Sequence, residues 1–166
     1  MVETTYYTHV PSPIGRLLLA GTDTALTTIA LPGDSAARLP RPEWTRSVTP
    51  FTDAIRQLEA YFAGELRRFR LTLAPVGTPF QQVVWRALSD IPYGETVSYA
   101  EVARRVGRAR AVRAVGAANG QNPIAIIVPC HRVIGSDGRL TGYGGGLPVK
   151  QALLALEQRH RAPLLF

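Results

Sequence analysis

The chain of 166 residues has only one cysteine, which excludes an internal disulfide and any zinc site built from several cysteines. Cys130 is therefore either a structural residue of the core or a reactive group, and the residues around it in the sequence distinguish the two roles. Lysine is nearly absent as well, because Lys150 is the single lysine among 19 basic residues. This bias towards arginine is compatible with genome composition as well as with heat tolerance.

Long apolar runs are also missing. No stretch approaches the roughly 18 apolar residues of a membrane helix, and residues 1–5 lack the basic-then-apolar layout of a signal peptide. The length and the hydrophobic content of 46% suit one compact domain or two small ones. We therefore expect a soluble, cytoplasmic protein without a membrane partner.

Acidic residues are in the minority, since 12 Asp and Glu face 19 Lys and Arg and the net charge is +7. The excess lies in the second part, where residues 78–166 hold 11 basic residues against 5 acidic ones. Five arginines follow one another with no acidic residue between the first and the last: Arg104, Arg105, Arg108, Arg110 and Arg113. An ordinary solvated helix face interleaves both signs, so this run favours a polyanionic partner, with a solvated surface as the alternative.

The first part of the chain, residues 1–74, reads as a small α/β domain. Residues 4–10, 16–20 and 25–31 have the composition of strands, and residues 12–15 have hairpin turn chemistry. A loop over 32–48 leads to a helix beginning at Thr49-Pro50, and residues 66–73 are predicted to return as a strand. His9 is isolated among scattered polar residues, so we expect a supporting domain without catalytic groups. Residues 75–78 form the predicted linker.

The second part, residues 79–166, carries clear helix signals. Thr78-Pro79-Phe80-Gln81 is a capping box that opens a helix to about Asp90, and Ser98-Tyr99-Ala100-Glu101 is a second one, whose helix ends near Gly107. A third helix over about 110–119 completes the layout of a helix-turn-helix with a basic second member. Short helix pairs also occur in proteins that do not bind DNA, so the pattern alone leaves both interpretations open.

The third helix combines one long cation, Arg113, with small side chains such as Ala114 and Gly116. A smooth surface of this kind can approach a groove closely while the arginine projects alone. Tight helix-helix packing is the alternative explanation, and the two can hold on opposite faces.

The chemistry-bearing segment is residues 122–134, where Cys130, His131 and Arg132 end an apolar run that resembles a buried strand. A thiol is a useful nucleophile as thiolate, and a neighbouring base such as His131 raises the thiolate fraction. In an extended segment adjacent side chains point to opposite faces, so the sequence does not assure direct contact between the two, and a bridging water is the alternative. A Cys-His pair on its own is as compatible with a structural role as with catalysis.

The residues Pro129-Cys130-His131-Arg132-Val133 resemble the active-site signature of the O6-alkylguanine-DNA alkyltransferases, the methylated-DNA–protein-cysteine methyltransferases. The surrounding blocks follow the same family's order and spacing over more than half of the chain. They are residues 91–99 (IPYGETVSY), 113–116 (RAVG), Asn122-Pro123 and 141–147 (TGYGGGL).

The resemblance implies an α+β fold, in which a small ribonuclease-H-like α/β domain precedes a mostly helical winged helix-turn-helix domain. It implies direct-reversal DNA repair, in which the alkyl group of O6-alkylguanine passes irreversibly to Cys130 in a single turnover, with O4-alkylthymine as a further candidate substrate. The partner is double-stranded DNA bound through its minor groove by a monomer, with cooperative binding left open, and the protein is nucleoid-associated when bound. No cofactor or metal is implied.

The same resemblance assigns roles to individual residues. Cys130 attacks the alkyl carbon, His131 acts as the base through water, and Glu157 orients it, with a surface carboxylate as the alternative for Glu157. Tyr99 donates to the departing guanine, and Asn122 holds the turn before the signature. Arg113 fills the gap left by the flipped-out base. The other expected contacts to the substrate or the DNA are the carbonyls of Cys130 and Val133, the pocket wall Tyr143, and Gly144, Ala114, Gly116, Ser98 and Arg132.

Two departures from the family pattern and three rival functions remain. Gly144 stands where some relatives have serine, and Val112 is bulkier than the alanine often found there. Alkyltransferase-like damage sensors carry tryptophan in place of the cysteine, and Cys130 argues against that class. A helix-turn-helix transcription factor leaves Cys130 and Glu157 unexplained, and a thiol hydrolase requires an acyl substrate and an oxyanion hole.

Overall fold

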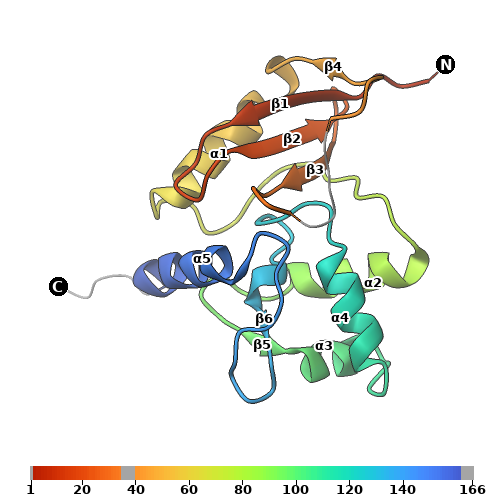
Figure 1. Ribbon diagram of the computed structural model, residues 1–166, viewed down its shortest axis with the longest axis vertical. Helices are drawn as coiled ribbons and strands as arrows, with labels where there is room; N and C mark the ends of the chain where they lie inside the picture. Colours follow the sequence, from red (N-terminus) through yellow and green to blue (C-terminus); the bar gives the residue numbers. More distant parts are fainter. Residues whose placement is uncertain (1, 35–39, 162–166) are drawn as a thin grey trace.

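The computed structural model describes residues 2–34 and 40–161, and Figure 1 shows a sheet with its covering helix stacked on a group of short helices. The sheet contains β1 (Tyr6–Val10), β2 (Leu17–Gly21), β3 (Leu26–Ala30) and β4 (Thr45–Arg46) in the order β3-β2-β1-β4. Neighbouring strands are antiparallel except for the parallel pair β1 and β4. Strand β2 is buried along its whole length, so side chains on both of its faces are shielded from solvent.

The hairpin turn between β1 and β2 is confirmed at residues 12–15. The Gly15 N–H donates to the Ser12 carbonyl over 3.0 Å, and the φ of Gly15 is +110°, a conformation that glycine adopts without a Cβ clash. The predicted helix at Thr49 begins with a 3₁₀ turn, η1 (Thr49–Phe51), and continues as α1 (Thr52–Phe62). Helix α1 lies along the sheet beside β1 and β2 (Figure 1), and its residues Ala54, Gln57, Leu58 and Tyr61 are buried.

Two predictions about the first part need correction. Residues 66–73 form no strand, because only Leu73 bridges to β3, at Leu26. Before that bridge, the Arg70 N–H donates to the Gln57 side chain over 2.8 Å, so a helix side chain replaces the strand partner that a ladder would supply. The expected loop over 32–48 contains the short strand β4, and its residues 35–39 lie outside the described residues.

The second part is mostly helical, as predicted. It contains α2 (Pro79–Ser89), β5 (Val97–Ser98), α3 (Tyr99–Arg105), α4 (Val112–Gly120), η2 (Cys130–Arg132), β6 (Val133–Ile134) and α5 (Leu147–His160). The first capping box is complete, since Thr78 and Gln81 bond each other in both directions. The second is half formed: Ser98 accepts from the Glu101 N–H, but the Glu101 carboxylate pairs with Arg104 and Arg105 instead.

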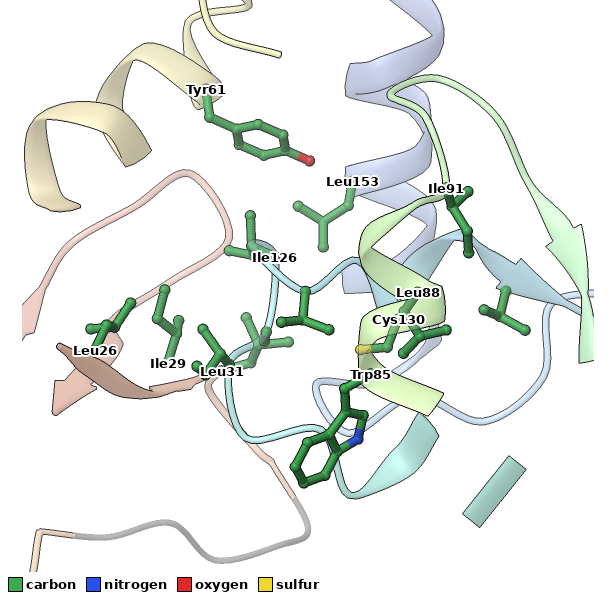
Figure 2. Packing of buried hydrophobic residues seen from close by; sticks show 14 of the residues in the cluster. Leu26, Ile29, Leu31, Tyr61, Trp85, Leu88, Ile91, Ile126, Cys130 and Leu153 are labelled. Atoms are coloured by element: carbon green, nitrogen blue, oxygen red, sulfur yellow. The ribbon is translucent and has the colours of Figure 1, made fainter. Parts of the chain in front are cut away.

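A short bridge joins the two parts at the segment that leads to Cys130. Ile29 of β3 pairs with Ile124: its N–H donates to the Pro123 carbonyl over 2.9 Å, and its carbonyl accepts from the Ala125 N–H over 3.1 Å. One apolar cluster runs from the sheet into the helices, and Figure 2 shows Cys130 within it, near Leu88 and Trp85. In the described part of the chain, no helix is both long and apolar enough to cross a membrane. The predicted α+β class is confirmed.

Candidate active site around Cys130

Cys130 opens the 3₁₀ turn η2 and is 6% exposed. The preceding residues 122–129 form tight turns and no strand, which corrects the expectation of an extended segment. The turns are closed by Asn122, whose side-chain oxygen accepts from the Ile124 N–H over 3.0 Å and whose amide donates to the Val128 carbonyl over 2.8 Å. Ile126 has a φ of +74°, which is costly for a β-branched residue and is held by its packed surroundings. Asn122 therefore lies where the turn before the signature needs it.

Burial raises the pKa of the Cys130 thiol, because the thiolate is poorly solvated in the core. A hydrogen bond from Asn122 and the positive charge of Lys150 act in the opposite direction without cancelling the effect of burial. The resting site therefore favours the neutral thiol, so the reaction needs a base that removes the proton.

His131 is fully buried, and its Nε2 lies 2.7 Å from Glu157 Oε2. An ionised carboxylate only accepts hydrogen bonds, so Nε2 carries the proton and Nδ1 presents a lone pair. His131 Nδ1 has no hydrogen-bond partner among the described residues, and none of them links His131 directly to Cys130. An imidazole with a free, buried lone pair can receive a proton, and a bridging water is the expected route.

Glu157 is fully buried on α5, which excludes the alternative of a surface carboxylate. Its oxygen Oε1 accepts from Arg132 Nε over 2.8 Å and from the Gly94 N–H over 3.2 Å. Burial alone raises the pKa of the Glu157 carboxyl, but the hydrogen bonds and charges of His131 and Arg132 hold it well below the ordinary value of 4.5. Glu157 is therefore ionised, and it fixes the tautomer and the orientation of His131.

Arg132 is placed differently from the prediction. Its side chain is buried, donates to both oxygens of Glu157 and also donates from Nη1 to the Ile91 carbonyl over 2.7 Å. All of these partners lie inside the protein, so the expected contact of Arg132 with DNA or substrate is corrected to a role in positioning Glu157. A guanidinium suits this task because its planar fork matches a carboxylate.

Acidification is expected to destabilise the protein through this cluster. Burial lowers the pKa of His131 below 6.5, so below that pH the unfolded chain binds a proton that the folded chain excludes. Near pH 4.5 the unfolded chain also protonates Glu157 while the folded chain keeps it ionised, which removes further stability. Urea unfolding at a series of pH values should show the free energy of unfolding falling from about pH 7 downwards. In His131→Gln the fall between about pH 7 and 5 should shrink.

His9→Gln is the matched control for that series. The pKa of His9 is also lowered, by partial burial and by the charges of Arg16 and Arg46, but His9 is a half-buried residue of β1 and takes part in none of the hydrogen bonds around Glu157. Most of the fall should remain in this variant. Equal stability of the wild type at about pH 7.5 and pH 5 would contradict the assigned protonation states.

A small cavity of about 20 Å³ lies beside Cys130. Its lining residues include Asn122, Tyr143 and Gly144. A cavity of this size holds about one water molecule. A Cβ on Gly144 would lie 3.0 Å from Asp34 Oδ1, so a serine at this position would require Asp34 to shift.

Lys150 is fully buried beside the same site, an unusual place for an ammonium group. Its Nζ donates to the Val133 carbonyl over 2.6 Å and to the Thr141 carbonyl over 3.2 Å. It also lies 5.9 Å from the ring centroid of Tyr99 and 6.0 Å from that of Tyr143. Lys150 thus connects α5 to both tyrosines of the site, and the Val133 carbonyl predicted to bind substrate already accepts one hydrogen bond.

Tyr99 lies in the first turn of α3, as predicted, with Ser98 as the N-cap. Its hydroxyl accepts from Thr141 Oγ1 over 3.0 Å. Gly116 of α4 faces it, since a Cβ on that glycine would lie 3.9 Å from Tyr99 Cδ1. Tyr99 therefore connects the helix pair to the loop that carries Tyr143.

Helix α4 has a buried face and an exposed face. Val115 and Ala118 are buried in the core, while Arg113 and Ala114 are exposed. The two explanations of its small residues therefore hold together, with packing on one face and a smooth surface around Arg113 on the other. Among the described residues, the side chains of Arg108, Arg110 and Arg113 have no hydrogen-bond or ion-pair partner, which leaves three exposed cations free to meet an anion.

The structure brings the predicted residues together in two groups. One group lies around Cys130. Its buried members are Cys130, His131, Asn122, Val133 and Glu157, and its half-buried members are Tyr143, Gly144 and Tyr99. The other is the surface of α4 around Arg113, Ala114 and Gly116.

Sequence reasoning missed Tyr61, whose hydroxyl donates to Glu157 Oε2 over 2.6 Å, and the site role of Lys150. The signal for Lys150 was available, because it is the single lysine in an arginine-rich chain. In residues 2–34 and 40–161, no three His, Cys, Asp or Glu side chains gather as a metal site would require.

Comparisons with known proteins match both parts of the chain. Residues 79–159 match the family model described as the DNA-binding domain of 6-O-methylguanine DNA methyltransferase, and residues 5–75 match the model of its ribonuclease-like domain. A methylated-DNA–protein-cysteine methyltransferase of Mycolicibacterium paratuberculosis is 57% identical over 154 residues, which cover 93% of this chain and 93% of the relative. A relative of the same name from Methanosarcina barkeri is 54% identical and covers 93% of this chain and 98% of its own.

A solved structure shares this fold over nearly the whole chain. The crystal structure of Mycobacterium tuberculosis OGT in complex with DNA superposes with a TM-score of 0.89 at 54% identity. The match covers 93% of this chain and 94% of that one. The similarity therefore includes the sheet, the helix pair and the segment that carries Cys130.

Proposed function

Because the chain belongs to the 6-O-methylguanine DNA methyltransferase family, we propose that Cys130 is the residue that accepts the alkyl group from O6-alkylguanine in DNA. The function of the protein is DNA repair by transfer of an alkyl group from DNA to a cysteine. Cys130 is the single cysteine of the chain. The assignment of Cys130 as the acceptor rests on this observation, and the neighbouring base His131 supports the assignment.

The reaction is a displacement at the alkyl carbon. His131 takes the thiol proton through a bridging water, and the resulting thiolate forms a carbon–sulfur bond. The bond between the carbon and O6 breaks, and its electron pair remains on the guanine. Tyr99 donates a hydrogen bond or proton to the departing purine, whose negative charge it stabilises. The products are guanine in DNA and a thioether on Cys130.

The target base must leave the duplex to reach Cys130, since the thiol is buried and a stacked base cannot approach it. The cavity of about 20 Å³ is far smaller than a purine, so the base enters by displacing part of the lining, for which we propose residues 142–144. Tyr143 and the carbonyls of Cys130 and Val133 are then the groups that hold the base, with Gly144 allowing its backbone to approach.

Single turnover is part of the proposal, because none of the groups assembled here can cleave a thioether. Mixing the protein with an excess of duplex that carries one O6-methylguanine should repair one lesion per protein molecule and then stop. Counting the remaining lesions after digestion and chromatography measures this stoichiometry. Repair of several lesions per molecule would contradict a cysteine acceptor and favour a hydrolase.

We propose that the protein binds DNA as a monomer. Arg113 then enters the minor groove and occupies the space that the flipped base has left. Replacing it with alanine should slow repair of the duplex by about 10- to 100-fold, because extrusion of a base costs a few kcal/mol that the inserted side chain offsets. Reaction with the free base O6-methylguanine should be unchanged. The comparison of both rates in wild type and Arg113→Ala tests the assignment.

Arg16→Ala supplies the matched control, because Arg16 is an exposed arginine in the turn between β1 and β2, and Figure 1 shows these strands in a different part of the molecule from α4. Its loss removes the same charge and should leave duplex repair within about twofold of wild type. If Arg113→Ala slows the reactions of the duplex and of the free base alike, Arg113 does not act through the flipped state.

Cooperative assembly on DNA and a cytoplasmic, nucleoid-associated location belong to the same proposal.

A further inference from the structure

The carboxylate that orients His131 is shared between the two parts of the protein. Glu157 Oε2 accepts from His131 Nε2 over 2.7 Å, from the Tyr61 hydroxyl over 2.6 Å and from Arg132 Nη2 over 3.1 Å. Tyr61 belongs to α1 and lies 96 positions away from Glu157 in the chain. Figure 2 shows it reaching from α1 towards α5. A residue of the first part is therefore in direct contact with the group that controls the proposed base.

The Tyr61 hydroxyl is locked as a donor. Its ring is fully buried and packs against Phe62, Phe69 and Tyr93, at centroid distances of 5.3, 5.5 and 6.2 Å. Burial and the nearby charge of Glu157 raise the pKa of Tyr61 far above its ordinary value, so the hydroxyl keeps its proton. A neutral hydroxyl beside an ionised carboxylate can only donate.

Donors that share one oxygen compete for its charge. Each hydrogen bond to Oε2 withdraws part of the negative potential that would otherwise stabilise a proton on His131. The other charged or titratable groups around Tyr61, Glu157 and His131 include Arg132 of η2, Lys150 of α5, Tyr93 of the loop before β5, Tyr143 and Cys130. All of them stay in place when only the Tyr61 hydroxyl is removed, so its contribution can be isolated.

We propose that Tyr61 is a positioning residue which, through Glu157, limits the proton affinity of His131 and so keeps the imidazole available as a base. The first part of the protein then tunes the reaction in the second part and is more than a support. The inference rests on the proposed function in one respect, namely that His131 removes the proton from Cys130.

The test is Tyr61→Phe, which keeps the ring and removes only the hydroxyl. With one donor fewer on Oε2, Glu157 attracts a proton on His131 more strongly, and the pKa of His131 should rise by about 0.5 to 1. The base must be neutral to act, so the acid limb of the single-turnover rate of methyl transfer should move to higher pH by the same amount. Nuclear magnetic resonance titration of the His131 ring and rates with a duplex carrying O6-methylguanine measure the two quantities.

Tyr93→Phe is the matched control. The Tyr93 hydroxyl is buried without a hydrogen-bond partner among the described residues, and its ring neighbours that of Tyr61. Removing it also deletes one buried hydroxyl from an aromatic ring, but the pKa of His131 and the acid limb should stay at their wild-type values. A merely structural role of Tyr61 would lower stability in both variants and move neither quantity.

A second substitution predicts the opposite sign and decides the case if Tyr61→Phe does not fold. In Tyr61→3-fluorotyrosine the electron-withdrawing fluorine makes the hydroxyl a stronger donor, so the pKa of His131 should fall. Unchanged titration of His131 in the variants that fold would overturn the proposal. The titration needs no substrate, so it separates this inference from the proposed function, whose failure would appear as absence of methyl transfer in the wild type.

Discussion

Replacing Cys130 with alanine is expected to abolish removal of the methyl group from O6-methylguanine while leaving DNA binding intact. The single cysteine of the chain is lost, and no other thiol can accept the group. The small change in a packed position should cost about 1 kcal/mol of the free energy of unfolding. The exposed face of α4 around Arg113 does not depend on the thiol, so binding persists. Lesion counts in the duplex and mobility shift measure the two properties.

Cys130→Ser serves as the companion variant, since it nearly preserves the volume and the possibility of a hydrogen bond. The serine hydroxyl is a far weaker nucleophile than a thiolate at neutral pH, so this variant should also fail to repair. Methyl removal by either variant would show that the acceptor is another residue. Loss of DNA binding together with activity would mean that the thiol side chain supports the fold more than its burial indicates.

Glu157→Gln is expected to impair both stability and transfer, the largest combined effect of any single change in the site. The variant leaves Arg132 as a buried cation without its counter-ion, a defect that costs about 3–5 kcal/mol. His131 loses the negatively charged acceptor that holds its proton on Nε2, because a neutral amide can present either its oxygen or its NH₂ group to the ring. The rate of transfer should therefore fall by about 10²- to 10⁴-fold. Urea unfolding and single-turnover rates provide the measurements.

Glu101→Gln is the control for stability, because it applies the same change to an exposed carboxylate. Glu101 pairs with Arg104 and Arg105 on the surface of α3, where solvent weakens the interaction. The control should remain almost as stable as the wild type. A Glu157→Gln variant with wild-type stability and a rate within about threefold would contradict the view that the buried carboxylate organises the site.

Local chemistry made a large part of the fold predictable. The capping residues Thr78 and Ser98 and the glycine of the first hairpin act within a few positions of the chain, and each was found where the sequence placed it. The exposed and buried faces of α4 also follow from its own composition. The resemblance to the alkyltransferase family is confirmed by the family models and the relatives.

Features that depend on distant partners could not be derived in this way. The strand expected over 66–73 is missing because the Gln57 side chain occupies a backbone group that a strand would pair. The apolar run before Cys130 is a different case with a local cause: its composition resembles a buried strand, but Asn122 bonds Ile124 and Val128 and so closes turns. Tyr61 and Glu157 form a hydrogen bond although they are 96 positions apart in the chain, and no local sequence pattern predicts such a contact.

The relation between the two parts changes how the first part is understood. Its sequence suggested a support without chemistry, and it supplies no nucleophile or base. It nevertheless bridges to the signature segment at Ile29 and bonds the carboxylate behind His131 through Tyr61. The site therefore depends on the packing of the two parts against each other, since both the Ile29 bridge and the Tyr61–Glu157 hydrogen bond would be lost if the parts separated.

The most direct test of the account is the intact mass of the protein after mixing with a duplex that contains one O6-methylguanine. We predict a gain equal to one added CH₂ on every wild-type molecule when the duplex is in excess, located on the peptide that contains Cys130. Binding of the duplex without any gain in mass, or a gain located on another residue, would contradict the assignment of Cys130 as the acceptor.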